Sequence, residues 1–230
     1  MVHLLKLELK KFGIVRNVLF TVAAILFSIL FITVSLVDSM TDPNQTKDTF
    51  SSTFLVIGLL IMIIFLVYSS ILTARLVIME YNQKTITIMF SYPVNRNQLI
   101  ASKMVIIMMF NALSMVLAYI CCCGYIVAAD KMFDMLEGTF QISFLQTWIP
   151  SAGIGVVVCT ILSLWPFVIG MIRKSVSSTI VTSLVMVFLR QLLISGNDTY
   201  RESVVQICLV AAVTMGATYL TFKKSVPQIY

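Results

Sequence analysis

Six long apolar runs, separated by short polar segments, divide this chain of 230 residues. A helix rises about 1.5 Å per residue, so about 20 apolar residues cross the roughly 30 Å hydrocarbon core of a bilayer. The pattern therefore predicts an all-α integral membrane protein, with residues 1–230 as a single transmembrane domain. The six predicted spans are residues 17–37, 53–73, 104–129, 148–172, 175–194 and 203–222.

The composition agrees with spans buried in lipid. Hydrophobic residues make up 59% of the chain and charged residues only 11%, with a mean hydropathy of +0.99. A soluble domain carries about 25% charged residues, so this chain has too little polar surface to cover a water-soluble globule. The first run is longer than the apolar core of a signal peptide and no small-residue cleavage site follows it, so we expect it to be retained.

Two further features concern the ends and the interiors of the spans. Residues 3–16 mix leucines with lysines, which predicts an amphipathic helix at the inner membrane surface; the alternative is a solvated N-terminal extension. Pro150 lies near the start of the fourth span, where a missing N–H is tolerated. Pro166 lies deep inside the same span and should kink or break the helix, because it removes a backbone hydrogen bond.

The basic residues are distributed very unevenly between the two sides of the predicted spans. Six spans place both termini on one side, and twelve of the sixteen Lys and Arg residues fall there. Eight of the ten acidic residues fall on the opposite side. Short cytoplasmic loops carry an excess of Lys and Arg, so we predict a multi-pass protein with both termini in the cytoplasm. The same asymmetry explains the net charge of +6 without a nucleic-acid partner.

The residues themselves exclude several kinds of catalytic site. His3 is the only histidine, so the chain has no Ser-His-Asp or Cys-His arrangement. It also lacks a G-x-x-x-x-G-K-[ST] sequence, so it cannot bind ATP through a P-loop of its own. We expect no enzyme activity, no metal and no cofactor in this chain. Cys121, Cys122 and Cys123 are interpreted as small membrane-helix residues, with a redox or acylation role as the alternative.

Residues 80–103 form a polar segment with a surplus of positive charge between the second and third spans. Apolar residues occur in it at helical spacing, and Pro93 separates two short helical pieces, because the residue before proline avoids the helical conformation. The second piece runs toward the third span. We predict a cytoplasmic coupling segment on which a soluble partner acts; the alternative is a solvated loop without a partner.

The order of these features resembles the permease subunits of bacterial type-2 ABC exporters, especially the small six-span kind linked to antimicrobial-peptide immunity and peptide export. The basic N-terminal helix before the first span also matches. The matching residues after the second span are Glu80-Tyr81, Lys84-Thr85, Ser91-Tyr92-Pro93-Val94, Arg96 and Ser102-Lys103. The chain departs from the pattern at Asn82-Gln83, where a glycine is usual after the glutamate, and the loop 195–202 shows no obvious re-entrant segment.

The resemblance implies partners, a location and residue roles. Two copies of a separate subunit that binds ATP and Mg²⁺ would dock on the coupling segment, in the bacterial cytoplasmic membrane. The implied ATPase-coupling residues are Glu80, Tyr81, Lys84, Pro93, Arg96 and Lys103. Two permease copies, as a homodimer or a heterodimer surrounded by membrane lipid, would face each other through spans two and five. The residues implied to line the substrate path are Tyr68, Ser69, Ser70, Ser178, Thr179, Thr182 and Ser183.

Several functions remain open from the sequence. A path lined mostly by apolar side chains suits amphipathic or hydrophobic substrates, and the resemblance implies export of peptides, with lipid or drug export as the nearest alternative. The hydroxyls named above could instead bond to their own helix backbone. A secondary transporter or passive pore is a rival class, although the spans lack the mid-membrane charges that ion coupling uses. A membrane anchor or sensor that recruits a soluble protein is another.

Overall fold

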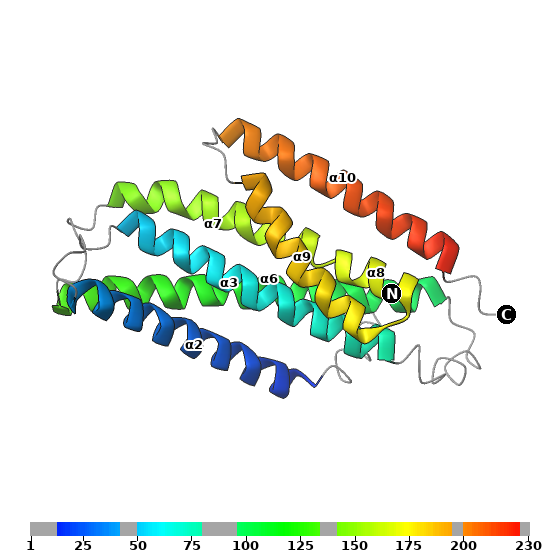
Figure 1. Ribbon diagram of the computed structural model, residues 1–230, viewed down its shortest axis with the longest axis horizontal. Helices are drawn as coiled ribbons and strands as arrows, with labels where there is room; N and C mark the ends of the chain where they lie inside the picture. Colours follow the sequence, from blue (N-terminus) through cyan, green and yellow to red (C-terminus); the bar gives the residue numbers. More distant parts are fainter. Residues whose placement is uncertain (1–12, 42–49, 80–95, 134–141, 195–199, 226–230) are drawn as a thin grey trace. The chain divides into compact units, whose positions relative to one another are not determined.

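The computed structural model describes residues 13–41, 50–79, 96–133, 142–194 and 200–225. Every element in these ranges is helical (Figure 1), which confirms the all-α prediction for the described part of the chain. The elements are α2 (Ile14–Thr41), α3 (Phe50–Thr73), the π-helix η1 (Ala74–Ile78), α6 (Arg96–Phe133), α7 (Ile142–Leu162), α8 (Trp165–Arg173), α9 (Val176–Ile194) and α10 (Tyr200–Ser225).

Four stretches of the described helices are long and apolar enough to cross a membrane: Val15–Asp38, Phe50–Ile78, Gln98–Met132 and Trp148–Arg173. They correspond to the first four predicted spans, so a multi-pass membrane protein is confirmed. The described parts of α9 and α10 contain shorter apolar stretches, Val176–Gln191 and Cys208–Thr221. The count of six spans therefore stays a prediction, as does the side of the membrane on which the termini lie.

The two prolines of the fourth predicted span behave differently. Residues 163 and 164 form a turn between α7 and α8, and Pro166 lies in the first turn of α8, where its missing N–H has no partner to lose. The predicted break at Pro166 is thus confirmed. The placement of Pro150 near a helix start was wrong, because α7 begins at Ile142 and includes Pro150 in its interior. Apolar residues before Trp148 extend this helix beyond the predicted span.

The chain packs as two compact units. The α2 unit comprises the described residues within Val15–Ile64 and Leu113–Val156, and the α8 unit comprises those within Phe65–Ala112 and Val157–Tyr230. Helices α3, α6 and α7 each contribute one part to each unit. Residues 3–12 of the predicted amphipathic helix lie outside the described residues.

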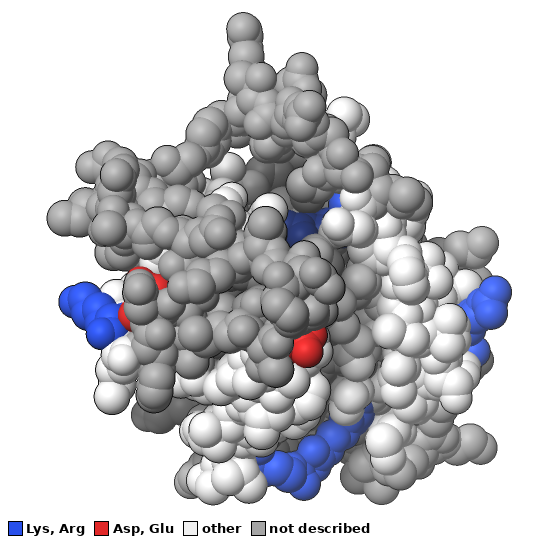
Figure 2. All heavy atoms as spheres, turned by 60° about the vertical axis from the view of Figure 1, so that its left-hand side comes forward, with Lys and Arg blue, Asp and Glu red and all other residues white. Residues whose placement is uncertain are grey.

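In the α2 unit, helix α2 turns several small and polar side chains inward and most of its large apolar side chains outward, whereas Ile32 and Leu36 are buried. Thr21 and Ser28 are buried, whereas Leu19 is 68% exposed and Leu30 is 62% exposed. Such a pattern suits a helix in lipid, where small residues let helices approach closely and apolar residues face the hydrocarbon. In the view of Figure 2, residues other than Lys, Arg, Asp and Glu make up most of the described surface.

Hydrogen bonds and aromatic contacts join the helices of the α2 unit. The Thr21 hydroxyl lies 3.2 Å from the Ser114 hydroxyl, and the Thr33 hydroxyl lies 2.7 Å from the Tyr125 hydroxyl, so α2 is bonded to α6 at two levels. Trp148 of α7 contacts two rings, since its centroid lies 4.7 Å from that of Phe54 and 5.8 Å from that of Tyr119. These contacts connect α3, α6 and α7.

The α8 unit has its own apolar core, built from four elements. Helices α3, α6 and α8 and the π-helix η1 supply the buried residues, and α8 also contacts α9 and α10. The core residues are Tyr68, Leu72, Val77, Ile78, Met104, Ile106, Ile107, Phe167, Val168 and Met171. The end of the second span, the start of the third and the short helix α8 therefore form one packed body.

Gly170 allows α8 to approach α9 and η1 closely. A Cβ added to this glycine would lie 2.6 Å from the Thr179 Oγ1 atom and 3.0 Å from the Ile78 Cδ1 atom. Both neighbours are buried, so neither can move away freely. We call this contact between Gly170, Thr179 and Ile78 the glycine seam.

The glycine seam predicts that adding a single methyl group at Gly170 destabilises the fold. Gly170→Ala should lower the free energy of unfolding by about 1–3 kcal/mol through overpacking, measured by unfolding of the purified protein in detergent. Gly216→Ala in α10 is the matched control, because a Cβ there meets no atom within 4 Å; it should be neutral or stabilise by up to about 1 kcal/mol. Equal stability of the two variants would contradict the close contact at Gly170.

Candidate functional site

The coupling segment is described only at its two ends. Glu80, Tyr81, Lys84 and Pro93 lie outside the described residues. Arg96 is the first residue of α6, but the structure describes only its backbone. Lys103, about two turns further along α6, is the ATPase-coupling candidate whose side chain is described. The ends of the segment are η1 and the first turns of α6, and both belong to the core of the α8 unit.

Lys103 is buried and bonds to the opposite end of the segment. Its side chain is only 4% exposed, and its Nζ donates a hydrogen bond to the backbone carbonyl of Leu76 at 3.1 Å. A buried ammonium needs such partners, because removing a charge from water is costly. The bond ties α6 to η1, so the two helical ends on either side of residues 80–95 are held together.

Leu76 lies where the second span departs from α-helical geometry. In η1 the backbone bonds reach five residues instead of four, as shown by the Met79 N–H that donates to the Ala74 carbonyl. A π-helical turn is rare and is frequent at functional sites. The helix of the second span continues past residue 73 to Met79, and nothing in the residue pattern indicated the π-turn.

The substrate-path candidates of the second span face the interior of their own unit. Tyr68 belongs to the core, with its ring centroid 6.3 Å from that of Phe110. Ser69 and Ser70 are fully buried and donate to the carbonyls of Leu66 and Val67 at 2.8 and 2.7 Å. Each of these hydroxyls is therefore bonded to its own helix in this structure.

The candidates of the fifth span divide into two groups. Thr179 and Ser183 are fully buried and donate to the carbonyls of Ser175 and Ile180 at 2.9 and 2.7 Å. Ser178 and Thr182 instead line a cavity, although the Thr182 hydroxyl also donates to the Ser178 carbonyl at 2.7 Å. The structure thus places two of the seven path candidates on the lining of a cavity in the α8 unit, with Thr182 only 5% exposed.

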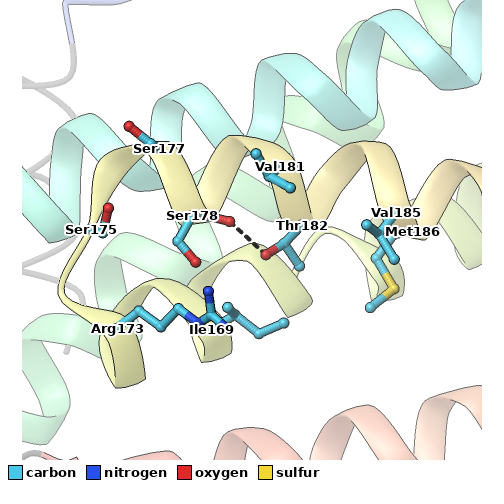
Figure 3. Close-up of a pocket in the computed structure, with 9 residues that line it drawn as sticks. All are labelled: Ile169, Arg173, Ser175, Ser177, Ser178, Val181, Thr182, Val185 and Met186. Atoms are coloured by element: carbon cyan, nitrogen blue, oxygen red, sulfur yellow. Dashed lines mark hydrogen bonds between the residues drawn. The ribbon is translucent and has the colours of Figure 1, made fainter.

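The cavity that Ser178 and Thr182 line lies along α8 and α9 and has a volume of about 600 Å³ (Figure 3). We call it the α8–α9 cavity. Its lining residues are Ile169, Arg173, Ser175, Ser177, Ser178, Val181, Thr182, Val185 and Met186. Ligand pockets commonly have volumes of about 300–1,000 Å³, so this space is large enough to hold a small ligand or part of a lipid.

The comparison with protein families gives a clear result. Residues 4–190 match the model of a family described as "ABC-2 family transporter protein". This chain belongs to the ABC-2 transporter family. The matched range includes the coupling segment, the buried Lys103 and every residue that lines the α8–α9 cavity.

This ABC-2 family member is also similar to a bacterial protein. It is 29% identical over 136 residues to the protein named "Uncharacterized protein YcbO" of Bacillus subtilis (strain 168). The match covers 59% of this chain and 60% of that relative, so it spans less than two thirds of the relative's length. No solved structure matches the chain.

Sequence reasoning on this family member missed two buried polar features. The burial of Lys103 could not be read from its position in a basic segment, although it precedes the buried Ile107 by one helical turn. Asn111, one further turn along, is fully buried, and its amide has no hydrogen-bond partner among the described residues. An asparagine in the middle of an apolar helix was the available signal. Among the described residues, no three His, Cys, Asp or Glu side chains are grouped as a metal site would require.

The burial of Lys103 predicts slow chemical modification. An amine-reactive, membrane-impermeant reagent should label Lys103 at least about tenfold more slowly than the exposed Lys131 of the same helix, since labelling requires a local opening. Peptide mass spectrometry of the purified protein after a timed reaction measures both rates in one sample. Equal rates would show that the Lys103 ammonium is open to water.

Proposed function

We propose that this chain is the permease subunit of an ATP-driven ABC exporter that moves amphipathic or hydrophobic substrates, with peptides as the first candidates. The observation that carries the proposal is the ABC-2 family match over residues 4–190. The absence of a P-loop sequence agrees with it, because the chain must then obtain the energy of ATP from a separate subunit.

In this proposal the partner ATPase, with its ATP and Mg²⁺, docks on residues 80–95 and on the start of α6. Glu80, Tyr81, Lys84 and Arg96 make the contacts, and Pro93 sets the turn between the two helical pieces. Lys103 does not touch the ATPase; it positions the two ends of the segment. Since its bond to Leu76 and the shared core join η1 to α6 and α8, a displacement of the segment moves these helices together.

Two permease copies form the transport path, as a homodimer or a heterodimer in the bacterial cytoplasmic membrane with both termini in the cytoplasm. The position of Ser178 and Thr182 on the lining of the α8–α9 cavity supports a role for α9 in that path. Tyr68, Ser69, Ser70, Thr179 and Ser183 would contact a substrate only after a conformational change that opens the α8 unit.

Co-purification tests the proposal directly. The chain, co-expressed with each candidate ABC ATPase of its genome, should retain one of them in detergent and stimulate its ATP hydrolysis. A Glu80→Ala, Arg96→Ala double variant should stimulate ATP hydrolysis at least about tenfold less, because charged contacts across an interface are removed. The Lys131→Ala, Asp134→Ala double variant is the control, since it removes one base and one acid from a predicted outer loop. Retention of no ATPase in any pairing would contradict the proposal.

The positioning role of Lys103 predicts a separation of binding from coupling. Lys103→Met keeps the length and the apolar part of the side chain but removes the donor to the Leu76 carbonyl. The ATPase should still co-purify, while stimulation of its activity falls at least about threefold, in line with the loss of one charged hydrogen bond. Unfolding measured in the same detergent checks that the variant is folded. If the folded Lys103→Met variant stimulates ATP hydrolysis as strongly as the unchanged chain, Lys103 has no role in coupling.

A further inference from the structure

We propose that the α8–α9 cavity binds an anionic phospholipid of the inner leaflet, with the phosphate at Arg173 and an acyl chain along α9. This inference goes beyond the proposed transport function and does not depend on it. The argument rests on the separation of polar and apolar lining residues, on unused hydroxyl groups and on the position of the cavity in the chain.

The polar lining residues gather at one end of the cavity. Arg173 ends α8 and Ser175 follows after one residue, so both lie at the turn between α8 and α9. Figure 3 shows the Arg173 side chain extending back along the cavity toward Ile169, with the Ser178 side chain directed to the same side. A guanidinium group presents several N–H donors in a planar fork that matches the geometry of a phosphate.

The hydroxyls at this end are available for a ligand. In the part of the chain that the structure describes, no hydrogen bond is recorded for the hydroxyls of Ser175, Ser177 and Ser178. The next three hydroxyls of α9 all donate to their own helix, from Thr179, Thr182 and Ser183. The hydroxyls without a hydrogen bond are those nearest Arg173 in the sequence. Free donors therefore gather where a phosphate would bind.

The other end of the cavity is apolar. Val181 and Val185 are 58% and 48% exposed on α9, and Ile169 and Met186 complete this part of the lining. Such side chains suit contact with an acyl chain, because lipid tails are as apolar as these residues and pack against them by van der Waals contact. A soluble anion would use only the polar end, and a fully apolar molecule would leave the Arg173 charge without a partner. A phosphate joined to a hydrocarbon chain fits both ends.

The position of the cavity selects the leaflet. Arg173 and Lys174 belong to the twelve basic residues of the predicted cytoplasmic side. The cytoplasmic leaflet is rich in anionic lipids, which attract basic residues at the membrane edge. The polar end of the cavity therefore lies at headgroup depth in this orientation, and the apolar end extends along α9 into the hydrocarbon.

The test uses the full chain purified in a neutral detergent, with bound lipid measured by native mass spectrometry. Dioleoyl phosphatidylglycerol should bind, and dioleoylglycerol, which lacks the phosphate, should bind at least about tenfold more weakly. Arg173→Gln should weaken phosphatidylglycerol binding by about tenfold. Lys174→Gln is the matched control, because it removes a neighbouring charge that does not line the cavity, and it should change binding less than about twofold.

A second variant tests the apolar end independently of the charge. Val181→Trp fills the cavity from the exposed side and should also weaken phosphatidylglycerol binding, with monodisperse elution as the check on folding for each variant. The inference is overturned if dioleoylglycerol binds equally well, if Lys174→Gln and Arg173→Gln act alike, or if inorganic phosphate displaces the lipid at equal concentration. The inference is also overturned if the chain forms a dimer in which the second copy covers the cavity and phosphatidylglycerol does not bind. None of these results bears on ATPase co-purification.

Discussion

The hydrogen bond from the Lys103 ammonium to the Leu76 carbonyl connects two helices that the sequence separates by a long polar segment. The Lys103 side chain is only 4% exposed. Burying its charge in an apolar unit is energetically costly unless polar groups surround it. The π-turn of η1 supplies one such group from the backbone. The two ends of residues 80–95 are fixed to each other as a result, and the core residues of α3, α6 and α8 pack around that junction.

The rest of the molecule follows the physical rules of a helix bundle in lipid. No water satisfies backbone or side-chain polar groups there, so each must find a partner inside the protein. The serines and threonines of α3 and α9 mostly donate to their own helices, and Thr21 and Thr33 bond across to α6. Most large apolar side chains of α2 face outward, whereas Ile32 and Leu36 are buried. Most polar groups thus serve internal packing, and the buried Asn111 amide and the hydroxyls near Arg173 are exceptions.

The sequence predicted the parts of this fold that depend on hydropathy and on proline. Long apolar runs located the first four spans, and Pro166 located the break between α7 and α8, because both signals are local. The extent of α7 before Pro150 was missed, since the residues ahead of it are compatible with either a loop or a helix. The buried Lys103 bonds to a residue 27 positions away in the sequence, in the π-turn. Such contacts leave no local pattern.

The candidate site was predictable to a smaller degree. The charge after the second span predicted a coupling segment, and the family resemblance implied a substrate path along the hydroxyls of spans two and five; both roles stay predictions. Which hydroxyls face outward was not predictable, because Ser178 and Thr179 are neighbours and differ only in the side of α9 on which they lie. Arg173 was interpreted only as part of a topology signal, whereas the turn after α8 also places it in a cavity.

The glycine seam has a consequence for how this cavity can change in evolution. The backbone of α8 at Gly170 lies directly against the side chains of Thr179 and Ile78, since a Cβ there would lie 2.6 Å from the Thr179 Oγ1 atom. This contact sets the spacing of α8 and α9. Substitutions at exposed positions such as Val181 and Val185 alter the depth and chemistry of the cavity without altering that spacing. Relatives with the same seam could therefore diverge in ligand preference through two or three surface positions while retaining one helical scaffold.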